Sequence, residues 1–103
     1  MLIIYNEIVL DRYLLVLAPG KASEASLAEH LDRACRSNTP AVWVDCRLLD
    51  TVSATTAWLL WACQQRLRRR HVRLVLCRVS RCLEDTLRQV LPNSDLHVVP
   101  TLD

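Results

Sequence analysis

The sequence predicts a single α/β domain over residues 1–103, with a mixed sheet of four or five strands, an N-terminal hairpin and about three helices. Three observations lead to this prediction. The hydrophobic period changes from strand-like to helix-like within residues 41–65, two apolar runs near the N-terminus are separated by a short polar step, and helical and strand-like segments alternate afterwards. A chain of 103 residues has the length of about one domain.

The N-terminal part of the chain is expected to form a hairpin and a helix. Residues 2–10 and 13–17 are apolar runs on either side of Asp11 and Arg12. The second run is apolar on both faces and is expected inside the sheet, whereas the first carries polar residues and is expected nearer an edge. From Ser23 to about Arg36 the apolar residues recur at helical spacing, which predicts the first helix.

The central stretch predicts a strand that leads into the second helix. The strand covers residues 41–44 and ends near Asp45, and the helix runs from near Thr55 to about Arg70. Three hydroxyl side chains lie at the expected start of this helix: Ser53, Thr55 and Thr56. A helix start presents unpaired N–H groups and the positive end of the dipole, which favour an anion. The same hydroxyls also suit simple capping, so both interpretations stay open.

The C-terminal part predicts a strand over 72–79, a third helix capped by Ser80 and stopped by Pro92, and a short strand over 95–99. The last three strands, each separated by a helix, are expected to be parallel. One helix face cannot bury both Trp58 and Trp61 against one sheet, so one of them is expected to be exposed and to form part of an interface. The residues expected to be buried are Trp43, Val44, Leu60, Leu74, Leu76, Leu83 and Leu87.

Composition argues against several chemical classes. Gly20 is the only glycine, which excludes a glycine loop that cradles phosphate. The five cysteines contain no C-x-x-C pair, so they are expected to be reduced and mostly buried rather than bridged or bound to zinc. No nucleophilic side chain is paired with a general base at a spacing that indicates a catalytic site. We therefore expect no catalytic residues, no metal and no cofactor.

Charge and hydropathy indicate where the protein is located and whether it binds nucleic acid. The apolar runs are shorter than the ~18 residues that span a bilayer, and no basic region precedes the first run, so a cytoplasmic protein without membrane insertion is expected. Residues 51–83 contain seven arginines and no acid, although the net charge is only +2. Aromatic residues are not interleaved with these arginines as stacking on single strands requires, so no nucleic-acid partner is expected.

The order of elements resembles the STAS domains, named for sulfate transporters and anti-sigma factor antagonists, over nearly the whole chain. In that family a strand ending in Asp is followed by a motif Asp-Ser-Ser-Gly-Leu-Gly, whose second Ser is phosphorylated. Counting from Asp45 places Ser53 at the motif's Asp and Thr55 at the phosphorylated Ser. The stretch 71–80 also resembles the family's later strand and helix start.

This chain departs from the motif, because Ser53 replaces the acid and Thr56 and Trp58 replace the glycines. A shifted register would use Asp50 and Thr51 as the acid and hydroxyl pair. The resemblance implies Thr55 as the phosphoacceptor, with three alternatives: Ser53, Thr51 and Thr56. It implies a partner-binding surface formed by Asp50, Ser53, Trp58 and Trp61.

The resemblance implies two functions. The first is a non-enzymatic bacterial signalling module of the anti-sigma factor antagonist type, which regulates transcription by binding an anti-sigma factor with serine/threonine kinase activity. The second is a constitutive subunit of a stress-signalling complex or of a lipid-transporting ABC transporter, without phosphoregulation. Either function is compatible with a homodimer.

Overall fold

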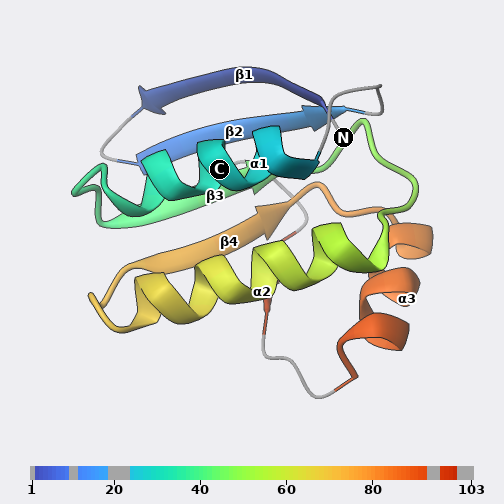
Figure 1. Cartoon of the computed structure of the whole chain (residues 1–103). Coiled ribbons are helices and arrows are strands. Elements are labelled where there is room, and N and C mark those ends of the chain that lie inside the picture. Colours follow the sequence, from blue (N-terminus) through green and yellow to red (C-terminus); the bar gives the residue numbers. More distant parts are fainter. Residues whose placement is uncertain (1, 10–11, 19–23, 93–95, 100–103) are drawn as a thin grey trace.

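The computed structural model describes residues 2–9, 12–18, 24–92 and 96–99 of the chain, with three helices and five strands (Figure 1). The strands are β1 (Leu2–Val9), β2 (Arg12–Ala18), β3 (Ala41–Asp45), β4 (Arg73–Cys77) and β5 (His97–Val99). The helices are α1 (Glu24–Cys35), α2 (Ala54–Arg68) and α3 (Arg81–Val90).

The strands form one sheet in the order β1-β2-β3-β4-β5. β1 pairs with β2 antiparallel, while β2, β3, β4 and β5 pair in parallel. This confirms the hairpin, the mixed sheet, the edge position of β1 and the parallel arrangement of the last three strands. The predicted turn falls partly outside the described residues, since Asp11 is not among them and Arg12 already belongs to β2.

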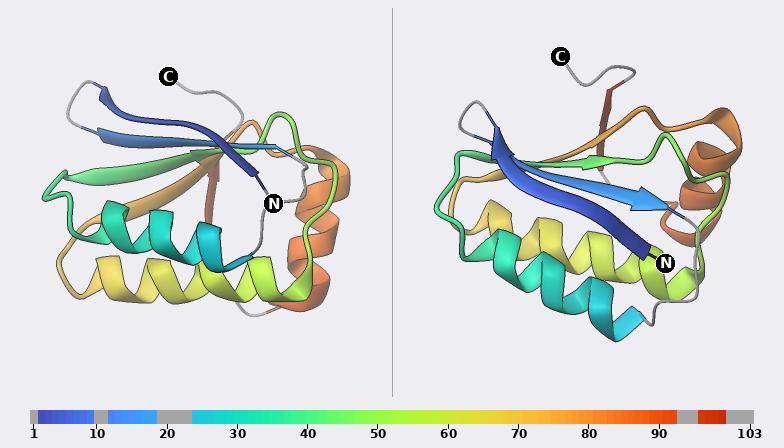
Figure 2. Two further views of the ribbon diagram at one scale, coloured as in Figure 1. Left: turned by 45° about the horizontal axis from the view of Figure 1, so that its top comes forward. Right: turned by 90° about the horizontal axis from the view of Figure 1, so that it is seen from above.

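The core lies between one face of the sheet and helices α1 and α2, which run side by side across that face, with α3 at one end of the sheet (Figure 2). The sheet contributes inward-facing residues from β2, β3 and β4, and the helices close over them: Leu15, Leu17, Val42, Val44, Leu74, Leu76, Leu27, Leu31, Leu60, Leu67, Leu83 and Leu87. Six of the seven residues predicted to be buried are buried.

The prediction of a buried Trp43 was wrong, because its side chain is only partly buried. Side chains alternate along a strand, so Trp43 lies on the opposite face from its neighbours Val42 and Val44, which join the core under the helices. The Arg12 guanidinium lies 4.4 Å from the centre of the Trp43 ring, within the range of a cation–π contact.

Two element boundaries differ from the predicted ones for a backbone reason. α2 ends at Arg68 and β4 ends at Cys77, each earlier than the hydrophobic pattern predicts. His71 and Arg78 adopt φ of 60° and 57°, in the left-handed region that neither a helix nor a strand can use. Over the described residues, the structure contains no helix with the length and apolarity that a bilayer-spanning segment needs.

Candidate functional site

The candidate site lies where β3 leads into α2, beyond the carboxyl ends of the parallel strands. Asp45 ends β3, and only 4% of its surface is exposed. Its Oδ1 accepts a hydrogen bond of 3.0 Å from the backbone N–H of Arg47, and its Oδ2 lies 3.7 Å from the Arg78 guanidinium. The carboxylate therefore joins the loop after β3 to the loop after β4 and fixes the path of the chain toward α2.

Ser53 is the N-cap of α2. Its backbone is extended, with φ of −71° and ψ of 160°, and its Oγ accepts a hydrogen bond of 3.1 Å from the Thr56 N–H. The Ser53 hydroxyl also donates to the Thr56 Oγ1 at 3.1 Å. This pair satisfies one of the unpaired N–H groups at the helix start, so capping is the role of Ser53 and not of Thr55.

The four candidate phosphoacceptors differ in access. Thr56 is 1% exposed and lies in the interior, so a kinase cannot reach its hydroxyl in the folded chain. Ser53 is exposed, but its oxygen takes part in the cap. Thr51 is exposed in the link before the helix, and Thr55 is exposed in the first turn of α2. This first turn contains no acidic residue, so an anion at Thr55 would meet no like charge from its own turn.

Trp58 and Trp61 confirm the expectation that one of the two tryptophans is exposed. Trp58 is 51% exposed, whereas Trp61 is partly buried and packs against the core. The rings meet edge to face, with centres 5.6 Å apart and planes at 83°. Trp58 follows Thr55 by three residues, which places both side chains on one face of the helix.

The link before α2 adds a residue that the sequence analysis missed. Leu48 is 42% exposed, next to the exposed Arg47 and two residues before the exposed Asp50. The link also contains the apolar residues Leu49 and Val52, which are buried, so its composition does not single out Leu48. Asp50, Ser53, Trp58 and Trp61 were predicted as partner contacts, and all except Trp61 are exposed.

The cysteines are thiols, and four of the five are buried, as expected. The Sγ atoms of Cys35 and Cys63 lie 3.5 Å apart between α1 and α2. Burial raises the pKa of Cys46 to about 12 and that of Cys77 to about 11, which keeps both thiols protonated at neutral pH. Among the described residues, no group of three or more His, Cys, Asp or Glu side chains is placed to hold a metal ion.

No protein-family model matches this sequence, and no curated protein matches it. Solved structures do. A variant of RsbS from Moorella thermoacetica, a STAS-domain anti-sigma factor antagonist, superposes with a TM-score of 0.82 at 15% identity, over 95% of this chain and 86% of that one. The protein TM1081 gives 0.81 at 10% identity, over 94% and 80%. A chain from the stressosome, described as a signal integration and transduction hub, gives 0.75 at 14% identity, over 95% and 89%.

These likenesses cover almost the whole of this chain and most of each neighbour. They agree with the element order, the parallel sheet with its N-terminal hairpin, and the two helices on one face. The chain therefore has the STAS fold.

Proposed function

We propose that this chain is a non-enzymatic protein-interaction module of the anti-sigma factor antagonist type, acting in the bacterial cytoplasm to regulate transcription. The observation that carries the proposal is the pairing of an exposed hydroxyl, Thr55, with a half-exposed tryptophan, Trp58, on one face of the first turns of α2. The similarity in fold to RsbS and to a stressosome chain supports a role in binding other proteins.

The proposed partner surface follows the start of α2 and the link before it. Trp58 is its apolar anchor, since half-exposed tryptophans at a surface are typical binding residues. Asp50 and Ser53 supply polar contacts at its edge, and Trp61 supports the Trp58 ring from the core side. The partner is an anti-sigma factor with serine/threonine kinase activity, which both binds this surface and modifies it.

Phosphate at Thr55 would act as the switch. It adds about −1.5 to −2 charges at the positive end of the α2 dipole, where an anion is favoured. The fold should therefore survive the modification. A partner that packs on Trp58 would have to accommodate a dianion one helical turn away, and this would lower its affinity.

A second function is favoured by a specific observation. Ser53 occupies the place of the family's motif acid and is committed to the helix cap, and a bulky Trp58 occupies the place of a glycine. These features suit a constitutive subunit of a stress-signalling complex or of a lipid-transporting ABC transporter, whose surface is always covered and never phosphorylated. Self-association through Trp58 would give a homodimer by the same surface.

Purification of the tagged chain from its own cell, followed by identification of the proteins that remain bound, separates these functions. The proposal expects an anti-sigma kinase, and a transporter ATPase or a stress-signalling scaffold would support the second function. The captured kinase is then incubated with ATP and the protein, and phosphate is located by mass spectrometry. The expected result is phosphate on Thr55 of the wild type. Thr55→Ala should lose this phosphate, and Thr51→Ala should be modified like the wild type. Phosphate on Thr51 or Ser53 would mean that the family motif aligns with this chain in a different register. The absence of any phosphate would overturn the proposed switch.

A further inference from the structure

Two cysteines from different helices meet in the core between α1 and α2. Cys35 is the last residue of α1, Cys63 lies in the second half of α2, and the two are 28 residues apart in the sequence. Both side chains are buried, and their Sγ atoms are 3.5 Å apart. An S–S bond is about 2.05 Å long, so a shift of about 1.5 Å brings these two sulfurs to bonding distance.

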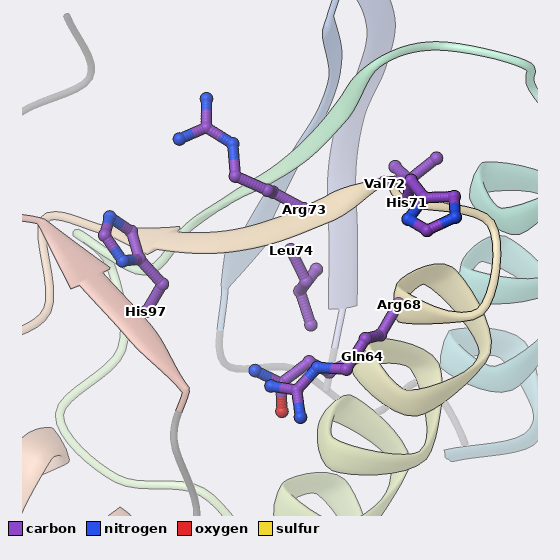
Figure 3. A pocket seen from close by; sticks show the side chains of 7 residues that line it. All are labelled: Gln64, Arg68, His71, Val72, Arg73, Leu74 and His97. Carbon is purple, nitrogen blue, oxygen red and sulfur yellow. The ribbon is translucent and has the colours of Figure 1, made fainter.

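The Cys63 side chain is fixed on the face of α2 that packs in the core. Leu60 and Leu67, about one turn before and one turn after it, are also buried in the core. The next residue, Gln64, points away from α1, into a hollow beside β4 and β5 (Figure 3). Cys63 is therefore held in place by its own helix, and a closer approach of the two sulfurs depends on Cys35.

Cys35 lies where α1 ends, and the end of a helix opens more readily than its middle. The Arg70 guanidinium, which follows the end of α2, donates hydrogen bonds to the Cys35 carbonyl and to the Asn38 Oδ1. Arg70 thus holds the last turn of α1, and with it Cys35, against the end of α2.

Burial protects this pair in the closed structure. Burial raises the pKa of Cys63 far above the usual range of a thiol, and the neighbouring Cys35 raises it further. Only a thiolate attacks a disulfide, so Cys63 in the closed structure is unreactive toward small oxidants at neutral pH.

The other two buried cysteines have a different arrangement. Cys46 and Cys77 each donate the S–H group to the Val44 carbonyl oxygen, at sulfur-to-oxygen distances of 3.7 Å and 3.5 Å. These two thiols bind a backbone oxygen and serve as an internal control for the pair that binds sulfur to sulfur.

We propose that Cys35 and Cys63 are a redox-active pair, which a low-molecular-weight disulfide oxidises to an intramolecular disulfide between α1 and α2. The end of α1 unfolds locally, and the Cys35 thiolate attacks one sulfur of the reagent, which forms a mixed disulfide and releases one thiol. The Cys63 thiolate then attacks the Cys35 sulfur and releases the second thiol. Two electrons pass from the pair to the reagent, and the two released thiols take up the two protons. Excess thiol reverses both steps.

The disulfide closes a loop that contains β3 and the first part of α2. A cross-link between residues 28 positions apart restricts the unfolded chain and so stabilises the fold. Disulfides of cytosolic proteins are usually transient and respond to oxidants, which suits a pair that stays reduced until an oxidant is present. The pair shares no residue with the partner surface, so the proposal stands whether or not Thr55 is phosphorylated.

The test uses Cys82→Ser, which removes the exposed cysteine as a competing site. The protein is incubated with oxidised glutathione and quenched with acid, the remaining thiols are alkylated, and a tryptic digest is analysed by mass spectrometry without reduction. Trypsin cuts after arginine and places the four remaining cysteines in separate peptides: 34–36, 37–47, 48–66 and 74–78. The expected product links peptide 34–36 to peptide 48–66, and dithiothreitol should separate them. Absence of this link, or links from Cys46 or Cys77 in equal yield, would overturn the proposal.

Thermal unfolding measures the consequence of the bond. The oxidised protein should have a midpoint temperature at least about 10 °C above that of the reduced protein. Cys63→Ala, added to Cys82→Ser, should show no rise on oxidation relative to its own reduced form. Cys46→Ala in the same background removes a buried thiol outside the pair and should show the full rise. A linked protein that is no more stable than its reduced form would overturn the cross-link as a stabiliser of the native fold.

Arg70→Gln tests the route of oxidation. This variant removes the contact that holds the end of α1, so the link should form about fivefold faster than in the parent protein. Arg69→Gln removes the same charge at the exposed neighbouring position and should react like the parent. Equal rates in the two variants would overturn local unfolding of the α1 end as the route.

Discussion

The Ser53 hydroxyl accepts a hydrogen bond from the Thr56 N–H and donates one to the Thr56 hydroxyl, both at 3.1 Å. Thr55, between these two residues in the chain, is exposed, while Thr56 is buried. Three hydroxyls that look alike in the sequence thus have three environments. One caps the helix, one is available on the surface and one belongs to the interior.

The first prediction separates the cap from the exposed hydroxyl. Ser53→Ala should lower the free energy of unfolding by about 1 kcal/mol, because it removes the acceptor of the Thr56 N–H. Thr55→Ala should change it by less than about 0.5 kcal/mol, as is usual for an exposed position. Urea unfolding followed by circular dichroism measures both. Equal losses in the two variants would show that Thr55 has a structural role and weaken its case as a switch.

The second prediction concerns the two tryptophans of α2. Trp58→Ala should leave stability nearly unchanged, whereas Trp61→Ala should cost ~2 kcal/mol because Trp61 packs against the core. Acrylamide should quench part of the tryptophan fluorescence of the isolated chain, and this part should disappear in Trp58→Ala. Protection of the same fraction when the partner binds would place Trp58 in the interface. If quenching of the wild type and of Trp58→Ala is identical, the exposed fluorophore is another tryptophan.

The third prediction follows from the buried thiols. Burial raises the pKa of Cys46 to about 12, well above the value of about 8.5 for an unfolded thiol. Above pH ~8.5 the unfolded chain loses this proton and the folded chain keeps it, so stability is complete at lower pH and falls as pH rises toward about 12. The slope is at most about 1.4 kcal/mol per pH unit for this thiol.

Urea unfolding at pH 7, 8.5 and 10 tests this dependence, and Cys46→Ala should reduce the slope without abolishing it, because burial also raises the pKa of Cys77. In the same experiments a thiol reagent at neutral pH should modify Cys82 rapidly, because it is the exposed cysteine, and the four buried cysteines only on unfolding. Rapid modification of all five in the folded chain would contradict the burial.

The fourth prediction concerns Arg70, which ties the ends of two helices together. Its guanidinium donates to the carbonyl of Cys35, the last residue of α1, and to the Asn38 Oδ1 at 2.6 Å. Arg70→Gln should cost about 1 kcal/mol, since the C-terminal carbonyl of α1 loses a charged donor. Arg69→Gln, at the exposed neighbouring position, should cost less than about 0.5 kcal/mol. Thermal unfolding distinguishes the two variants, and equal midpoint temperatures would contradict a stabilising role for the Arg70 contacts.

Much of the fold could be predicted from the sequence because the periodicities of its hydrophobic residues are regular. The hairpin, the amphipathic α1 and the Ser80 cap of α3 all follow from local patterns, and the structure shows Ser80 accepting a hydrogen bond from the Leu83 N–H. The degree of burial of the Trp43 side chain could not be predicted in this way. Residues 41–44 are apolar on both faces, and such a run does not say which face the helices cover.

The site was predicted in part. The sequence placed hydroxyls at the start of α2, but three of them within four residues could each be the cap, and only the observed first turn assigns that role to Ser53.

The last prediction tests the switch through its charge. Thr55→Glu places an anion in the first turn of α2, at the positive end of the dipole, and should raise the free energy of unfolding by about 0.3–1 kcal/mol. The same variant should bind the captured partner at least about tenfold more weakly than Thr55→Ala, because a negative charge then lies one turn from Trp58 and must be desolvated in the interface. Thr51→Glu is the matched control, since it adds the same charge in the exposed link before the helix and should affect stability little. Calorimetric titration and urea unfolding give the two quantities for each variant. A stabilised Thr55→Glu that binds as tightly as Thr55→Ala would mean that the fold accepts the charge but the partner does not sense it, and the constitutive subunit would then be the better account of this chain.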